Sequence, residues 1–289
     1  MAQTRNSVTL GTATPGGGFP VYGAAFAETV NAQEPALEVR PQNTRGSTDN
    51  VPLLEAGRLD LALVAGEVAN AQLAKPDNRL RIVAAMYSSP GLFVVRADSP
   101  ARSIADLRGK PVALGAQGSG LTIMGRNVLA ALGIEVQPIY LEKAADGPGM
   151  VLDGRAAALW GAGVGWPGFA AVAKAGARFI APSADEISRI LARNAALQAM
   201  QMPAGAYPGI AQPLATVGSW SHVLARADLP EDTGYRLARA LHWAEGPLAA
   251  RLAQAKQTTA ANTVAAAPRP DLIQPGVQRY LREVGLLRQ

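Results

Sequence analysis

The sequence predicts an α/β fold in which two lobes offer binding loops to a shared cleft. The first observation is a glycine-rich loop, Gly11–Pro20, between an apolar strand pattern and a helical pattern. Such a loop presents backbone N–H groups at the helix start, and its glycines let a ligand approach the backbone. The same design recurs at Ala116–Gly120. The third observation is the alternation of strand and helix patterns up to Val64, which indicates α/β layering.

The elements of the first part of the chain follow from periodicity and from helix-ending residues. Apolar runs predict four strands, at Val8–Leu10, Leu37–Arg40, Leu59–Val64 and Leu80–Met86. A helix is expected over Val21–Asn31, and a second helix should begin with Ser47 or Thr48 as its N-cap and end at Gly57.

The elements of the second part repeat this alternation. Strands are expected at Leu92–Val95, Pro111–Gly115, Ala156–Trp160, Ala177–Ile180 and Ala215–Leu224. Helices are expected at Ile104–Lys110, Leu121–Leu132, Phe169–Ala175, Ser183–Met200, Asp232–Ala244, Ala249–Thr258 and Val277–Val284. Gly161–Pro167 is a third glycine-rich loop, and the prolines and glycines of Met202–Pro213 predict another loop.

Composition limits the classes of function. A chain of 289 residues with 48% hydrophobic content can fill one large core or two lobes. The net charge is +5, but the basic residues are scattered and aromatics make up 5%, which argues against nucleic-acid binding. The absence of cysteine excludes disulfides, thiolate metal sites and a cysteine nucleophile. No apolar run approaches the roughly 18 residues of a membrane span, and Met1–Arg5 shows no signal peptide.

The candidate ligand-binding residues of the first lobe lie in and after its loops. Ser47, Thr48 and Asn50 stand at a helix start, where they either cap the helix or hold an acidic group of the ligand. Arg45 either pairs with a ligand carboxylate or with a surface acid. The loop that we expect to line the cleft contributes Thr14, Gly16, Gly17, Gly18 and Phe19.

Other candidates stand at the ends of strands or at later loops. Tyr87 ends a strand, where its ring either closes over a ligand or packs in the core. Glu67 either receives a ligand ammonium or simply stabilises a helix N-terminus. In the second lobe, Trp166 is either an apolar wall of the site or a core anchor. The other second-lobe candidates are Gln117, Gly118, Ser119, Thr122 and Gly163.

Enzymatic chemistry has weak support in the sequence. His222 and His242 are the only histidines, and they lie on different elements without an acidic partner at metal-ligand spacing. Ser119 lies in Gly118-Ser119-Gly120, which is not a G-x-S-x-G nucleophile elbow. A ligand-sensing domain that feeds a signalling partner remains an alternative, although no helix-turn-helix precedes Val8. We expect no catalytic residue, no metal and no cofactor.

The order of several motifs resembles the TAXI-class solute-binding receptors of tripartite ATP-independent periplasmic (TRAP) transporters, within the NMT1-like group of periplasmic binding proteins. The resemblance runs nearly end to end. The stretches that carry it are Gly16–Phe19 followed by Tyr22-Gly23, Gly46–Asn50, Leu54–Ala62, Ile104–Val112, Gly118–Gly120 and Pro275–Val277.

The resemblance implies a type II periplasmic binding protein with two mixed sheets flanked by helices. Two strands would cross between the lobes, near Gly91–Arg96 and Leu214–Arg226. Lobe 1 would comprise residues 1–93 and 218–289, and lobe 2 residues 94–217. Tyr22 joins the candidate ligand-binding residues on this ground.

The function that the resemblance implies is capture of a small carboxylate or amino acid in the periplasm, for delivery to TRAP membrane subunits. The receptor would be a monomer, its signal peptide missing from this sequence. Three departures from the family pattern concern the ligand more than the fold, namely Ala85–Ser89, Gly66–Val68 and Gln274–Val277.

Overall fold

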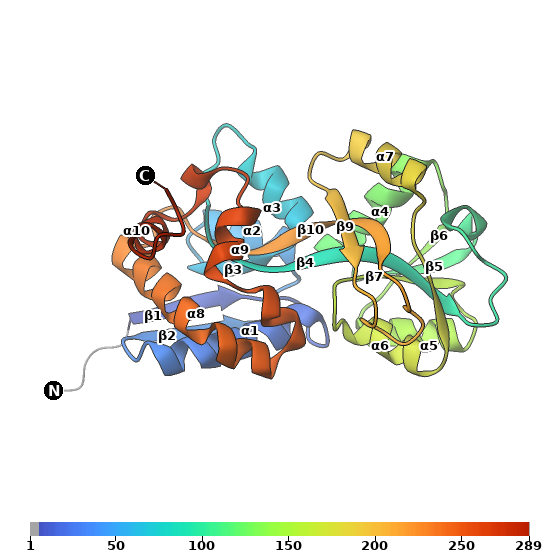
Figure 1. Cartoon of the computed structure of the whole chain (residues 1–289), viewed down its shortest axis with the longest axis horizontal. Coiled ribbons are helices and arrows are strands. Elements are labelled where there is room, and N and C mark those ends of the chain that lie inside the picture. The colour runs from blue at the N-terminus through green and yellow to red at the C-terminus, as the bar shows by residue number, and fades with distance from the viewer. Residues whose placement is uncertain (1–5, 289) are drawn as a thin grey trace. The chain divides into compact units, whose positions relative to one another are not determined.

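The computed structural model describes residues 6–288, so the opening Met1–Arg5 lies outside the described residues. The fold is mixed α/β, as the sequence predicts. The chain divides into two compact units (Figure 1). Unit 1 contains the described residues up to Pro15, Phe19–Tyr87 and the chain from Trp220 onward, and unit 2 contains Gly16–Gly18 and Ser88–Ser219.

Two long strands contribute to both units. Strand β4 spans Arg81–Arg96, and the division between the units falls at Tyr87. Strand β10 spans Leu214–Ala225, and the division falls at Ser219. Two long strands therefore run from one unit to the other, as the fold class predicts; the division along β4 lies a few residues before the expected Gly91–Arg96, and that along β10 lies within the expected Leu214–Arg226.

The sheet of unit 1 has the strand order β2-β1-β3-β10. Its first three strands are parallel, and β10 runs antiparallel to β3. Buried residues alternate along β1, whereas all of β3 is buried, as expected for a strand covered on both faces. These strands are β1 (Asn6–Gly11), β2 (Leu37–Gln42) and β3 (Leu61–Val64).

Helices cover both faces of the unit 1 sheet (Figure 1). One core includes Phe26, Leu63 and Leu237 and joins the sheet to three helices, α1 (Gly18–Gln33), α8 (Glu231–Arg251) and α10 (Pro275–Glu283). A second core includes Leu54, Ala69 and Leu224 and joins the sheet to α2 (Ser47–Glu55) and α3 (Gly66–Leu73). Three short helices complete the unit, η2 (Ala253–Gln257), α9 (Ala260–Ala266) and η3 (Pro270–Leu272).

Unit 2 has a mixed sheet around three parallel strands. Strand β5 pairs in parallel with β6 and β7, and β7 and β8 each pair antiparallel with β4. Strand β9 pairs antiparallel with the first half of β10. The bounds are β5 (Pro111–Gly115), β6 (Gln137–Tyr140), β7 (Ala158–Ala162), β8 (Ala177–Ile180) and β9 (Gln198–Met202).

Two cores fill unit 2. The larger surrounds Trp160, which is 1% exposed and donates from its indole nitrogen to the Leu121 carbonyl at 2.8 Å. Gly91 and Gly125 let the backbone lie against this ring, since a Cβ at Gly125 would come within 2.7 Å of it. This core lies under η1 (Ile104–Leu107), α4 (Gly120–Leu132) and α7 (Ala184–Arg193), and the second core under α5 (Asp146–Leu152) and α6 (Pro167–Lys174).

Some element boundaries differ from the sequence prediction. The helix expected over Ser183–Met200 ends at Arg193, where the Asn194 amide bonds the Ile190 carbonyl at 2.9 Å. The chain then forms β9, because its residues find a partner in the distant β10 that no local pattern reveals. Conversely, α8 continues through Gly246 and Pro247, where the sequence predicts a break, and both residues are exposed.

Candidate functional site

The parallel strands of unit 1 end at one edge of its sheet. Gly11, Gln42 and Val64 are the last residues of β1, β2 and β3, and a loop follows each strand. We call these loops (residues 12–15, 43–46 and Ala65) the unit 1 loop edge; the next three residues, Gly16–Gly18, belong to unit 2. Ligands of open α/β sheets bind beyond the carboxyl ends of parallel strands, so this edge is the candidate site of unit 1.

Side chains fasten the loops of this edge to one another. The Thr12 hydroxyl donates to the Gln42 carbonyl at 2.9 Å, and the Thr44 hydroxyl donates to the Thr12 carbonyl at 3.1 Å. The Asn50 amide nitrogen donates to the carbonyls of Thr12 and Leu63, both at 2.8 Å. Asn50 is fully buried, so it holds the loops together from beneath.

The predicted capping of α2 is wrong. Its N-cap residue is Gly46, with φ 106°, and among the described residues no side chain caps this end. A positive φ suits glycine, which explains why Gly46 precedes the serine. Ser47 is buried and its hydroxyl accepts from the N–H of Ala65 at 3.0 Å, so it links the start of α2 to the start of α3. Thr48 is exposed on the first turn of α2.

Two of the candidate aromatics are core residues. Tyr22 is 0% exposed, and its hydroxyl lies 2.9 Å from that of Thr258. The Tyr87 ring is buried and packs edge-on against Tyr22, with centroids 5.5 Å apart. Burial raises the pKa of both phenols, so both stay neutral. Phe19 is half-buried against the same core.

The remaining candidates of unit 1 and of the first glycine-rich loop differ in exposure. Thr14 is half-buried in the loop after β1. Arg45 is 88% exposed at its side chain and pairs with Asp49 at 3.4 Å, which is the surface-acid alternative of the sequence analysis. Glu67 is buried on the first turn of α3. The glycines of the first loop are exposed or half-buried, and Gly16 has φ 86°; they are Gly16, Gly17 and Gly18.

The loop after β5 repeats the design in unit 2. Ser119 is the N-cap of α4 and accepts from the Thr122 N–H at 3.2 Å, while their hydroxyls lie 3.0 Å apart. The buried Thr122 hydroxyl also reaches the Ala116 carbonyl at 2.8 Å. Gln117 is exposed at the tip, and Gly118 adopts φ 78°. The structure therefore brings Ser119 and Thr122 together as supports of the loop.

The loop after β7 is held by Tyr207, which is not among the predicted ligand-binding residues. The Tyr207 hydroxyl donates to the Gly163 carbonyl at 2.8 Å and accepts from the Trp166 N–H at 2.6 Å. Trp166 is 9% exposed and packs edge-on against Phe169, so it is a core anchor. Thr12, Thr44 and Tyr207 are not among the candidate residues predicted from the sequence, and only their three-dimensional contacts reveal their role.

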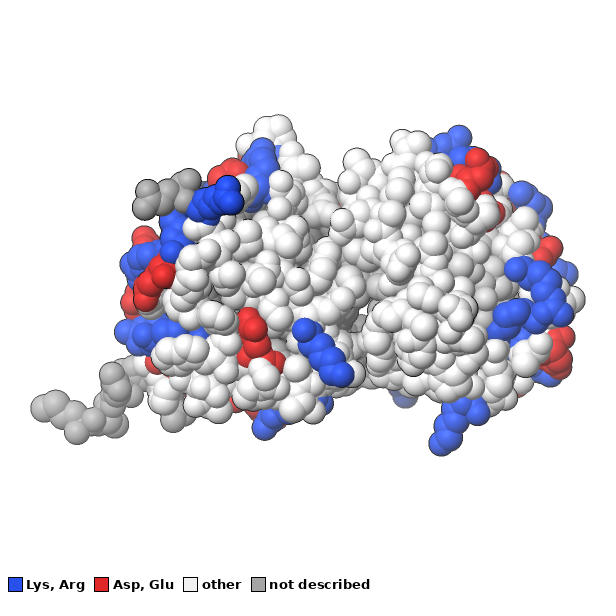
Figure 2. All heavy atoms as spheres, in the orientation of Figure 1, with Lys and Arg blue, Asp and Glu red and all other residues white. Residues whose placement is uncertain are grey.

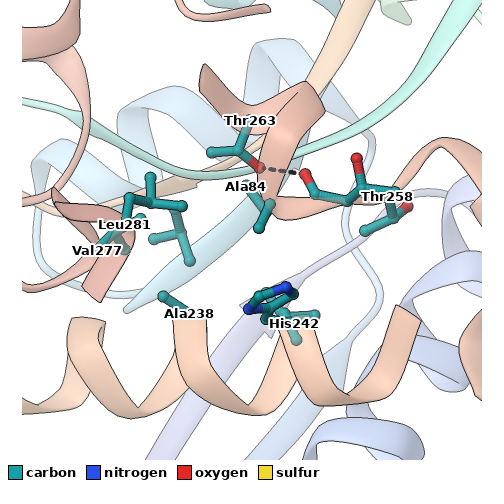
Figure 3. Close-up of a pocket in the computed structure, with 11 residues that line it drawn as sticks. Ala84, Ala238, His242, Thr258, Thr263, Val277 and Leu281 are labelled. Carbon is teal, nitrogen blue, oxygen red and sulfur yellow. Dashed lines mark hydrogen bonds between the residues drawn. The ribbon is translucent and has the colours of Figure 1, made fainter. Parts of the chain in front are cut away.

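A cavity of about 20 Å³ lies elsewhere in unit 1 (Figure 3). The ring of His242 borders it, and the Nδ1 atom of that ring lies 2.9 Å from the Tyr280 hydroxyl. The hydroxyl of Thr263, on the opposite side, accepts from the Ala85 N–H at 3.1 Å. This volume holds about one water molecule, so the cavity is too small for a metabolite.

Charge and metal chemistry add no second site. On the face shown in Figure 2, basic and acidic side chains are interspersed within each unit. Surface ion pairs such as Arg236–Asp232 and Arg155–Asp153 join opposite charges. Within residues 6–288 no cluster of three or more His, Cys, Asp or Glu residues is arranged to hold a metal ion. Over the same residues no helix is both long and apolar enough to cross a membrane.

The fold is that of periplasmic binding proteins. BugD, a periplasmic binding protein, superposes with a TM-score of 0.59 at 15% identity, over 98% of this chain and 99% of BugD. A TctC solute-binding protein from Polaromonas superposes with a TM-score of 0.57 at 17% identity, over 99% of this chain and 100% of the TctC protein. MatC from Rhodopseudomonas palustris, with bound malate, superposes with a TM-score of 0.60 at 14% identity, over 96% of this chain and 97% of MatC.

The sequence also assigns the family. The profile of the NMT1-like family matches residues 10–285, which is nearly the whole chain. The protein therefore belongs to the NMT1-like family.

Proposed function

We propose that the protein is a periplasmic solute-binding receptor that captures a small carboxylate or amino acid and delivers it to a membrane transporter. The observation that carries the proposal is the repeated design of the loops. In each unit, parallel strands end in glycine-containing loops that lead into helices, and buried side chains fix the shape of the loops. Helix N-termini and loop N–H groups of this kind bind anions without a catalytic residue.

The receptor would have two lobes, lobe 1 formed by residues 1–93 and 218–289 and lobe 2 by residues 94–217. These lobes correspond approximately to the two units, whose divisions fall at Tyr87 and Ser219. Closure of the lobes on the ligand would then create the form that the transporter recognises. The motif order that resembles the TAXI class favours TRAP membrane subunits as the partner. The malate bound to MatC supports a small acid as the ligand class.

A thermal-shift screen of the purified protein tests the proposal. The panel contains amino acids, dicarboxylates, aromatic acids and neutral sugars. A ligand present at about 100 times its dissociation constant adds roughly 2.7 kcal/mol of stability, a readily measured rise in Tm. We expect acids and not sugars to raise Tm. Mass spectrometry of the denatured protein identifies any ligand that co-purifies and masks the shift.

A matched pair of variants connects the response to the loop edge. Arg45→Ala changes an exposed residue of the unit 1 loop edge, and Arg155→Ala changes an exposed arginine of unit 2 outside the loops. Each arginine has a surface ion pair, so both substitutions should leave stability nearly unchanged. We expect only Arg45→Ala to weaken acid binding. A protein that neither responds to any acid nor releases one on denaturation would contradict the proposed function.

Uptake measurements test the partner. The receptor, its cognate membrane subunits and the identified acid are combined in proteoliposomes. For a TRAP-type partner we expect uptake that requires the receptor and an ion gradient but no ATP. Uptake that requires ATP hydrolysis would replace the TRAP assignment with an ATP-driven transporter and would leave the receptor function intact.

A further inference from the structure

His222 is a buried histidine whose ring nitrogens have no partner in the structure. It lies in the unit 1 part of β10 and is 1% exposed. Neither Nδ1 nor Nε2 makes a hydrogen bond with any of residues 6–288. A neutral imidazole carries one N–H donor and one acceptor nitrogen, and buried polar groups of native proteins nearly always have partners. Two unpartnered nitrogens on one buried ring therefore point to a partner outside residues 6–288.

Strand register places His222 next to the unit 1 loop edge. His222 pairs with Val64, the last residue of β3, and Leu224 pairs with Ala62. Side chains two residues apart on a strand share a face, so His222 shares the face of Leu224. That face packs against α2 and α3, because Leu224, Val64 and Ala69 belong to the same core. His222 therefore points toward the α2 and α3 side of the sheet, at the end where these helices begin.

Two helix N-termini lie at this end. Helices α2 and α3 start directly after the unit 1 loop edge, and among the described residues neither has a side-chain cap. Their starts are tied together by the bond from the Ala65 N–H to the Ser47 hydroxyl. Both N-termini carry a partial positive charge, which favours an anion.

The acidic side chains of these helices do not serve as partners of His222. Asp49 of α2 accepts from the Arg45 backbone N–H at 3.2 Å, and Glu55 of α2 accepts from the Gln72 amide at 2.7 Å. Glu67 is buried on the first turn of α3, and its carboxylate makes no hydrogen bond with either ring nitrogen of His222. Burial lowers the pKa of His222 to about 4, and no neighbouring carboxylate contributes to this shift. The imidazole is thus neutral at pH 7 and offers an N–H donor.

We propose that His222 is a ligand-contact residue, whose imidazole N–H donates to an oxygen of the small acid held at the N-terminal ends of α2 and α3. This inference rests on the proposed function and adds to it a named side chain and the chemistry of its partner, an anionic oxygen acceptor. Because the ring has no partner among residues 6–288, a bound acid would remove the cost of an unpaired buried donor.

Nuclear magnetic resonance of the ring nitrogens gives a direct test. The chain has only two histidines, so ¹⁵N-labelled histidine gives two sets of ring signals. His242 is an internal control, because its Nδ1 lies beside the Tyr280 hydroxyl on the other face of the unit 1 sheet. L-malate and L-glutamate are the two probes. We expect the acid that binds to shift the ring signals of His222 and to leave those of His242 unchanged.

Substitution gives a second, independent measurement. His222→Leu removes both ring nitrogens and should weaken binding of the same acid at least tenfold in calorimetry. His222→Gln keeps a hydrogen-bond donor and should lose less affinity for the acid than His222→Leu. His242→Gln should bind the acid as tightly as the natural protein. If His222→Leu fails to fold, the ring signals of the unsubstituted protein decide the question.

The outcomes separate the inference from the function on which it rests. If the protein binds one of the acids with unchanged His222 signals, or if His222→Leu binds it within twofold of the natural affinity, the inference is overturned and the receptor function stands. If neither these two probes nor any acid of the screening panel binds, and none co-purifies, the proposed function is contradicted and the inference falls with it.

Discussion

Replacing Tyr207 with phenylalanine removes a single hydroxyl that holds the loop Gly163–Trp166 at both ends. The hydroxyl donates to the Gly163 carbonyl and accepts from the Trp166 N–H. The ring itself should stay in place, because it is 4% exposed and stacks on Phe179 at a centroid distance of 5.6 Å. The substitution therefore tests the hydrogen bonds with little change in packing.

The magnitude follows from the two backbone groups that lose their partner. Each buried N–H or carbonyl left without a hydrogen bond costs about 1–3 kcal/mol, and removal of the buried hydroxyl offsets part of the sum. We therefore expect Tyr207→Phe to lower the free energy of unfolding by about 2–4 kcal/mol. Tyr235→Phe is the matched control, since the Tyr235 hydroxyl bonds Glu283 at the surface and its loss should cost under about 0.5 kcal/mol.

The assay combines two measurements. Denaturant unfolding followed by tryptophan fluorescence gives the change in stability of both variants. Amide hydrogen exchange gives a local reading, because the Trp166 N–H loses its acceptor only in Tyr207→Phe and should exchange faster there. If Tyr207→Phe costs no more than Tyr235→Phe and protection at Trp166 is unchanged, the hydroxyl does not hold this loop and the reasoning is refuted.

Three further predictions concern other buried groups. Asn50→Ala leaves two buried carbonyls without their donor and should cost about 2–4 kcal/mol in denaturant unfolding; a loss under about 0.5 kcal/mol would contradict its role in holding the loops. His222 has a pKa of about 4 when folded and about 6.5 when unfolded, so the unfolded state binds its proton first. The free energy of unfolding should therefore fall by roughly 3 kcal/mol between pH 6.5 and pH 4, and this pH-dependent part should be absent from His222→Leu. If the free energy of unfolding of both proteins changes equally with pH, the prediction is refuted. Gly125→Ala places a methyl group against Trp160 and should cost about 1–3 kcal/mol, whereas Gly246→Ala on the open face of α8 should be neutral or stabilising, and similar melting temperatures would contradict this packing argument.

The fold was predictable for those elements whose local sequence pattern favours the same secondary structure as their tertiary contacts. The continuous apolar run of β3 and the glycine loops that lead into α1 and α4 carry their own signals in sequence. Strand β9 was missed because its residues pair with β10, a contact that a local pattern does not contain. Helix α8 was divided at Pro247 because sequence cannot show that an exposed proline can be accommodated within a long helix.

The candidate loops were predictable, but the direction of their side chains was not. Ser47 stands at a helix start and was expected to cap its own helix or to bind ligand, yet its hydroxyl serves the neighbouring Ala65 N–H. Asn50 was expected to cap the helix or to hold an acidic group of the ligand, and its amide nitrogen instead holds the carbonyls of Thr12 and Leu63. A short polar side chain has the same sequence signal in both roles, and only its three-dimensional partners distinguish them. Whether the selected residues contact a ligand stays a prediction.

The inward direction of these polar side chains has a consequence for changing the ligand of this scaffold. Asn50 and Tyr207 hold the shape of their loops from inside, so substituting them alters the frame of the site before it alters what the site accepts. Arg45 and Gln117 are exposed at the loops and leave that frame intact. An engineer who wants a sensor for a different acid should therefore diversify the exposed rim and keep the buried supports as they are.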